Sequence, residues 1–92
     1  MNSPWGAIQT CRTIAPGIIS VTTASHGGLH VAPDLLAKMP EAMRSTPYSR
    51  GGWFEEDCDW ALVAVSFPEA FGETLVQAAK RTIASVYPEL VT

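Results

Sequence analysis

The residue types that can carry chemistry gather in two short segments of this chain. Residues 25–28 read Ser-His-Gly-Gly and place an imidazole beside two glycines, whose backbone another group can approach closely. Residues 55–60 read Glu-Glu-Asp-Cys-Asp-Trp and pack four carboxylates and a thiol ahead of an apolar run. Neither segment matches a catalytic motif of known mechanism, yet we expect any specific function to depend on them.

The second segment carries more acids than the start of a helix needs: Glu55, Glu56, Asp57 and Asp59. The first three fall in the first turn of a predicted helix, where the helix dipole stabilises each carboxylate by roughly 0.3–1 kcal/mol. Because four close negative charges repel one another, we expect something positive to offset them. The candidates are an arginine of the same chain, such as Arg44 or Arg50, a cationic partner, or a metal.

His26 admits two interpretations. In the simpler one it is a hydrogen-bonded loop residue that orders the two glycines beside it. In the other it is a base or a metal ligand whose tautomer is fixed by Glu55 or Glu56. A zinc site that adds His30 fits no standard ligand spacing, so we expect neither a metal nor a cofactor.

Cys58, His26 and an acid would formally compose a nucleophile triad. The apolar helix stripe that holds Cys58, and the carboxylates that would raise its thiol pKa, favour a small core thiol instead. Trp60 is assigned to the core. Trp53 follows two glycines in a predicted loop, where we expect it to be exposed. Together with Arg50 it would then contact a partner.

Size and composition narrow the class of protein. Ninety-two residues predict one domain spanning the whole chain, and the net charge of −3 argues against direct nucleic-acid binding. With 47% apolar and 16% charged residues, a hydrophobic patch is expected to remain for a partner or for a second copy of the chain. The sequence has neither a signal-peptide pattern nor a membrane-spanning run, so we expect a cytoplasmic protein with Cys11 and Cys58 reduced.

The first half of the chain has strand patterns. Residues 7–14 and 18–24 read as a hairpin around an Ala-Pro-Gly turn, and residues 29–31 as a short third strand after a turn at 26–28. Pro33 suits the start of a short helix, and residues 40–44 add a further turn. Residues 45–52 are predicted to be a loop.

The second half has helical patterns. Apolar residues from Glu55 to Phe67 predict a central helix covered on more than one side, with a buried strand as the alternative. A final helix from Gly72 to about Tyr87 is predicted with an apolar stripe of Leu75, Ala79, Ile83 and Val86. The expected fold is α+β, a three-stranded antiparallel sheet packed on two main helices and one short helix.

At these segments the chain resembles a small family of uncharacterised domains found in proteins of bacteriophages and integrative elements. The shared pattern is Ser-His-Gly-Gly at 25–28, an apolar residue at Leu29, a proline-led helix at Pro33, and Glu-Glu-Asp-Cys-x-Trp-Ala at 55–61. The resemblance covers roughly residues 18–71. It implies a mobile-element context and carries no established chemistry.

That context suggests a non-enzymatic antagonist of a host defence system, similar to anti-CRISPR proteins, in the cytoplasm of a bacterial host. Its expected partner is a host protein or ribonucleoprotein complex with a basic, nucleic-acid-binding surface. The expected contact residues are the acids of the second segment together with three neighbours: Glu55, Glu56, Asp57, Asp59, Trp53, Arg50 and His26. The alternative is a small enzyme or metal-dependent domain whose site joins His26 to the acids at 55–59.

Overall fold

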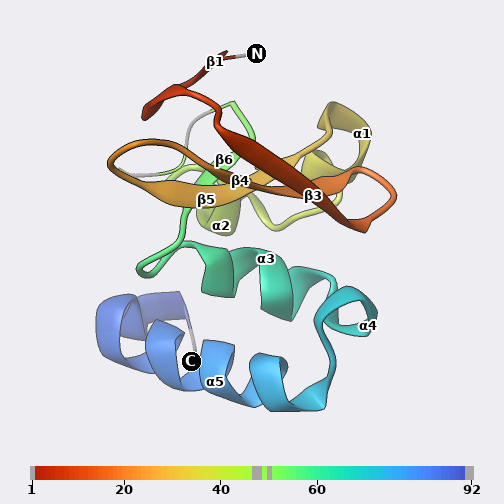
Figure 1. Cartoon of the computed structure of the whole chain (residues 1–92). Helices are drawn as coiled ribbons and strands as arrows, with labels where there is room; N and C mark the ends of the chain where they lie inside the picture. Colours follow the sequence, from red (N-terminus) through yellow and green to blue (C-terminus); the bar gives the residue numbers. More distant parts are fainter. Residues whose placement is uncertain (1, 47–48, 50, 91–92) are drawn as a thin grey trace.

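The chain folds in layers, with an antiparallel sheet above, helix α3 against one face of the sheet, and helix α5 beneath α3 (Figure 1). This computed structural model describes residues 2–46, 49 and 51–90. In chain order its elements are β1 (Asn2–Ser3), β2 (Gly6–Ala7), β3 (Thr10–Ala15), β4 (Ile18–Thr22), β5 (Gly27–Val31), α1 (Pro33–Leu36), α2 (Glu41–Arg44), β6 (Trp53–Glu55), α3 (Trp60–Ser66), α4 (Pro68–Phe71), α5 (Glu73–Val86) and a 3-10 helix (Pro88–Leu90). The α+β class predicted from the sequence is correct.

The main sheet has four strands in the order β3-β4-β5-β6, and every neighbouring pair is antiparallel. The prediction of three strands was therefore wrong, because β6 adds a fourth beside β5. Its three residues are too few to show strand periodicity in the sequence, and cross-strand pairing with β5 stabilises them. A separate two-stranded hairpin of β1 and β2 was not predicted either.

Strand register decides which side chains face the helices. Arg12, Ser20, Leu29 and Phe54 are successive cross-strand partners from β3 to β6, so they lie on one face of the sheet. Leu29 and Phe54 belong to the hydrophobic core, so this is the face that the helices cover. Arg12 therefore lies on the helix side, at the edge of the sheet.

Helix α3 is the central element of the core. Ala61, Leu62, Val63 and Ala64 are all fully buried, because the sheet covers one side of the helix and α5 the other (Figure 1). The prediction of a central helix is thus confirmed, and the alternative of a buried strand is excluded. The predicted helix start at Glu55 was wrong, since α3 begins only at Trp60.

Helix α5 matches the predicted final helix within one residue at each end. Its buried residues are Val76, Ala79 and Ile83, whereas Leu75 and Val86 are 48% and 40% exposed. The predicted apolar stripe was therefore wrong at Leu75 and Val86. Leu75 and Val76 both fit helical spacing with Ala79 and Ile83, so the pattern does not show which of them is buried. The position of α3 covers Val76 and leaves Leu75 exposed.

Candidate functional site

Strand pairing brings the two chemistry-bearing segments together. Gly28 of β5 lies opposite Glu55 of β6, and the backbone N–H of Glu56 donates to the Gly27 carbonyl oxygen at 3.0 Å. The Ser-His-Gly-Gly segment and the acidic segment, distant in sequence, are therefore neighbours at one end of the sheet. The strand that causes this meeting, β6, was not predicted from the sequence.

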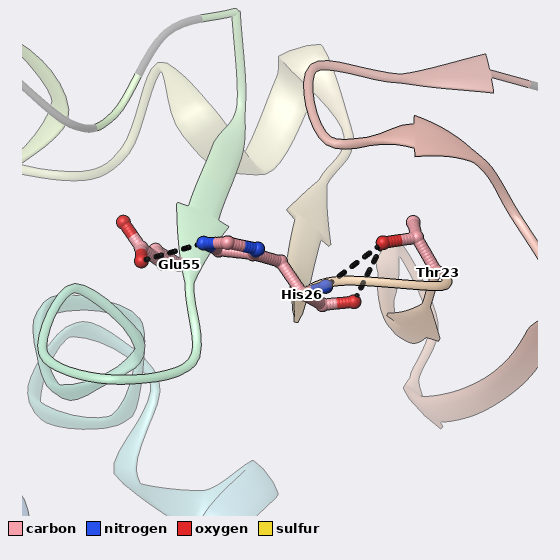
Figure 2. Close-up of polar contacts among 3 residues, drawn as sticks. All are labelled: Thr23, His26 and Glu55. Carbon is pink, nitrogen blue, oxygen red and sulfur yellow. Dashed lines mark hydrogen bonds and ion pairs between the residues drawn. The ribbon is translucent and has the colours of Figure 1, made fainter.

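His26 lies at the centre of this junction. Figure 2 shows its imidazole directed at Glu55, with His26 Nε2 3.8 Å from Glu55 Oε1. That separation is too long for a direct hydrogen bond and forms an ion pair only when the imidazole is protonated. The His26 side chain is 49% exposed and that of Glu55 is 23% exposed, so solvent screens the contact.

The backbone of His26 is held by Thr23. The Thr23 hydroxyl donates to the His26 carbonyl oxygen at 2.8 Å and accepts from the His26 N–H at 3.1 Å (Figure 2). The Thr23 N–H also donates to the His26 carbonyl oxygen at 2.7 Å. The turn between β4 and β5 thus spans residues 23–26, earlier than the predicted turn at 26–28, and His26 is part of its hydrogen-bonded framework.

The two glycines serve contacts within the chain. A Cβ atom at Gly28 would collide with the Trp5 ring and with the Phe54 carbonyl oxygen. A Cβ atom at Gly27 would lie 2.6 Å from the carboxylate oxygen Oε2 of Glu56. The groups that come close to the backbone of Gly27 and Gly28 therefore belong to the same chain: the β1–β2 hairpin, β6 and the turn at 56–59.

The acidic segment is not the first turn of a helix. Glu55 closes β6, residues 56–59 form a turn, and Asp59 is the N-cap residue of α3 without a side-chain capping bond. Glu56 and Asp57 are exposed and Glu55 is partly exposed. The helix dipole thus does not explain these three acids.

Asp59 differs from the other acids and must be removed from the expected contact surface. It is 1% exposed, and both carboxylate oxygens accept hydrogen bonds inside the fold. The Tyr87 hydroxyl donates to Oδ1 at 2.6 Å and the Thr46 hydroxyl donates to Oδ2 at 2.7 Å. Thr46 has one hydroxyl proton and gives it to Asp59, so the Ser49 hydroxyl is the donor in the 2.6 Å contact between Thr46 and Ser49. This chain of bonds ties the loop before β6 to the end of α5.

The acids also act on the groups beside them. Burial raises the pKa of the Cys58 thiol, and the charges of Asp59, Asp57 and Glu55 raise it further. Cys58 is partly buried and free, which agrees with the interpretation of an unreactive thiol. Burial, followed by the hydrogen bond to Asp59, raises the pKa of Tyr87 to about 12.

Trp53 is half-buried rather than free in a loop. Its ring meets Trp5 edge-on, with centroids 5.7 Å apart, and lies 4.4 Å from the His30 ring centroid. Burial lowers the pKa of His30. Trp53 and Glu55 alternate with the buried Phe54 along β6, so they share the sheet face that points away from the helices.

Arg44 does not neutralise the acids, although it was a candidate counter-ion. Its guanidinium donates to the Leu36 carbonyl oxygen at 3.4 Å. Within residues 2–46, 49 and 51–90, the contact of His26 with Glu55 is the one ion pair. Arg50, the other candidate and an expected contact residue, lies outside the described residues.

Hollows formed by the described residues lie around the site. A groove of about 650 Å³ lies between the sheet and the helices and reaches Glu56 at one end. A hollow of about 280 Å³ joins Glu55 and Asp57 to Val86 at the end of α5, and one of about 250 Å³ lies beside His26. The groove was not predicted: Arg12 was not singled out, and Leu75 was placed on the apolar stripe of the final helix.

In the described part of the chain, no group of three histidine, cysteine or acidic side chains is placed to hold a metal ion. None of the described helices combines the length and the apolar character needed to cross a membrane. The arrangement therefore offers one imidazole–carboxylate contact, a cluster of exposed acids and a neighbouring groove.

Comparison with known proteins identifies the family. The family described as Domain of unknown function (DUF7007) matches residues 1–92. No curated protein and no solved structure matches the chain. The expected resemblance to an uncharacterised domain family is correct at that level, and the match extends over the final helix as well. The chain belongs to this family of domains of unknown function.

Proposed function

We propose that this domain is a non-enzymatic binding protein that docks onto a basic partner surface through Glu55, Glu56 and Asp57. One observation carries the proposal: these acids are consecutive at the end of β6 and the start of the turn that follows, a segment we call the acidic turn. They face solvent at least in part and meet no lysine or arginine among the described residues. Exposed charges of one sign attract a partner of the opposite sign and orient it during encounter.

The surroundings of the acids strengthen their negative potential. The hollow that Glu55 and Asp57 share with Val86 lies at the carboxyl end of α5, where the helix dipole adds partial negative charge. No basic side chain occupies the last turn of α5 to offset it. Burial and the charge of Asp59 raise the pKa of the Cys58 thiol, and the charges of Asp57 and Glu55 raise it further.

Trp53 and His26 extend the proposed surface. Because Trp53 and Glu55 share a face of β6, a partner that contacts the carboxylate can also reach the part of the indole left exposed. Aromatic contact of this kind slows dissociation, whereas the charges mainly speed association. The His26 imidazole lies 3.8 Å from Glu55 and is 49% exposed, so a partner that contacts Glu55 can reach it as well.

We further infer that the partner is a host complex whose basic surface normally binds nucleic acid, as for an anti-CRISPR-like antagonist encoded by a mobile element. Support comes from the resemblance at residues 25–28 and 55–61 and from the acidic turn, which has the charge that such a surface attracts. The site of action would be the cytoplasm of a bacterial host.

The test compares two double charge reversals in a pull-down from host lysate. Glu55→Lys with Asp57→Lys changes the acidic turn, and Asp34→Lys with Glu41→Lys makes the same charge change on α1 and α2, where both acids are exposed. We expect the first variant to lose the captured partner and the second to retain it. Capture should also weaken as salt is raised, because the attraction is electrostatic.

Circular dichroism and thermal unfolding must first show that both variants remain folded. A partner retained by the Glu55→Lys, Asp57→Lys variant would refute docking through the acidic turn. A partner lost equally from both variants would mean that net charge, rather than this surface, controls capture.

A second function is favoured by the 3.8 Å approach of His26 Nε2 to Glu55 Oε1. Such a pair could serve acid–base chemistry or metal binding in a small enzyme, since a carboxylate beside an imidazole fixes its tautomer. Calorimetric titration of the purified protein with zinc tests the metal-dependent form. Binding that His26→Ala abolishes would favour it over the docking proposal, whereas binding that persists in that variant would exclude His26 as a ligand.

A further inference from the structure

The edge strand β3 has no strand partner on its outer side among the described residues; a bulge between Thr13 and Ala15 interrupts its register with β4, and α4 packs near the strand. Strand β3 pairs with β4 alone, and no described backbone hydrogen bond reaches its outer side. In an antiparallel sheet alternate residues direct their N–H and C=O groups away from the neighbouring strand, so part of the backbone of β3 lacks a strand partner. Such an edge is a template for an added strand.

An apolar groove runs beside this strand on the helix side of the sheet. Its volume of about 650 Å³ lies in the range of roughly 300–1,000 Å³ typical of ligand sites. Ile14 of β3 lines one wall, and Trp60, Phe71 and Leu75 line the helical wall. Leu75 is 48% exposed, the highest value among the large apolar residues described as exposed, so the fold leaves it uncovered at this groove.

Charge marks the rim of the groove. Arg12 lies on the helix side of β3, is exposed, and forms no ion pair with any described residue. Glu56 lines the same groove and also remains unpaired within the described residues. The two side chains do not neutralise each other, so Arg12 is free to receive an acidic group.

We propose that β3 and this groove bind an extended peptide segment of another protein, independently of the docking proposed for the acidic turn. The peptide adds to the sheet as an antiparallel fifth strand beside β3. An apolar side chain enters the groove against Phe71 and Leu75, and an acidic side chain two residues along the peptide, on the same face, meets Arg12.

A second copy of the chain fits this edge less well than a foreign peptide. Arg12 lies near the middle of β3, which spans Thr10–Ala15. Suppose that two β3 strands pair in antiparallel fashion and that the helices of both copies lie on the same face of the joined sheet. The two Arg12 side chains would then lie directly opposite each other or one pleat apart. Like charges so placed destabilise a pair of strands.

The test uses a library of random linear peptides selected on the whole protein, followed by affinity measurements with the best synthetic peptide. We expect selected sequences to share an apolar residue and an acid spaced two residues apart. Leu75→Gln and Arg12→Glu should each weaken binding about tenfold. Val86→Gln is the matched control, since Val86 is an exposed apolar residue of the same helix away from the groove, and it should bind normally.

Amide hydrogen exchange provides the structural readout. Outward N–H groups of β3 should exchange more slowly when the peptide is saturating, and they should stay unprotected in Leu75→Gln at the same peptide concentration. The proposal is overturned if exchange in β3 does not change, or if Leu75→Gln binds as tightly as the unchanged protein.

Self-association must be measured in the same samples by sedimentation equilibrium. A dimer whose formation slows exchange in β3 would show that a second copy occupies the edge, which also overturns the proposal. The Glu55→Lys, Asp57→Lys variant should keep peptide binding, because neither residue lines the groove. Failure of the docking proposal is thereby distinguishable from failure of this one.

Discussion

The two ends of one acidic segment meet opposite environments. Glu56 and Asp57 face solvent, whereas Asp59, only two residues beyond Asp57, is 1% exposed and accepts bonds from Tyr87 and Thr46. The side chains of Asp57 and Asp59 are chemically identical. The difference shows that exposed and structural carboxylates can lie within a single turn, according to whether donors from elsewhere in the fold reach the carboxylate.

The sharpest way to break this comparison is to remove each carboxylate in turn. Asp59→Ala should destabilise the protein by about 3 kcal/mol, because it leaves the buried hydroxyls of Tyr87 and Thr46 without their acceptor. Asp57→Ala should change stability by no more than about 0.5 kcal/mol. Urea unfolding followed by circular dichroism measures both.

The loss expected from Asp59→Ala is large beside a total stability of about 5–15 kcal/mol for a domain of ordinary size. Equal effects of the two substitutions would refute the division between a structural acid and exposed ones.

Tyr87 gives the next largest effect and carries a pH signature. The folded state raises the pKa of Tyr87 from its ordinary value of 10.0 to about 12, so between these pH values the folded protein keeps a proton that the unfolded chain loses. The stability from Tyr87 is therefore complete below pH 10 and is lost as pH rises from about 10 to about 12. Tyr87→Phe should cost about 1–2 kcal/mol at neutral pH and remove this part of the alkaline loss.

Tyrosinate absorbance during alkaline titration measures the pKa directly. The chain has two tyrosines, and comparison with Tyr87→Phe assigns the signal. A Tyr87 titration near pH 10 would contradict the buried bond to Asp59.

The reactivity of Cys58 depends on its burial, on the buried Asp59 and on the nearby acids Asp57 and Glu55. Because burial and three carboxylates raise its thiol pKa, alkylation of Cys58 at neutral pH should be slow in a Cys11→Ser background. Glu55→Gln with Asp57→Asn removes two of these charges and should accelerate the reaction severalfold, as followed by mass spectrometry. An unchanged rate would show that the acids create little local potential and would weaken the docking proposal.

The contact between His26 and Glu55 should have the smallest effect. Its partners are separated by 3.8 Å and partly exposed, so His26→Ala should change stability by less than about 0.5 kcal/mol at neutral pH. Thermal unfolding in low and high salt measures it. A loss of more than about 1 kcal/mol in the free energy of unfolding would show that His26, like Asp59, has a structural role.

The sequence predicted the parts of this fold that depend on local patterns. The β-branched residues of β4, the Pro-Gly turn before it, and Pro33 at the start of α1 specify their elements through backbone preferences. The apolar run after Trp60 indicated a helix covered on both sides, as found. These features require no knowledge of distant segments.

The candidate site was only half predictable for the same reason. Residue type alone marked His26 and the acids at 55–59, and the strand register then brought His26 beside Glu55. The three residues of β6 form a strand by pairing with β5, a contact with a distant segment that no local pattern indicates. This is why the helix begins at Trp60 and not at Glu55, as predicted. Sequence spacing could not show that Asp59 turns inward, since its donors lie at positions 46 and 87.

The sequence by itself determined the α+β class, the central helix, and the chemical character of the two segments, because these follow from local preferences and side-chain types. Tertiary structure alone decided which acid is buried, which apolar residue of α5 is left exposed at the groove, and why residue 28 is a glycine. Each of these depends on contacts between residues distant in the chain, such as Trp5 with Gly28, that no local pattern encodes.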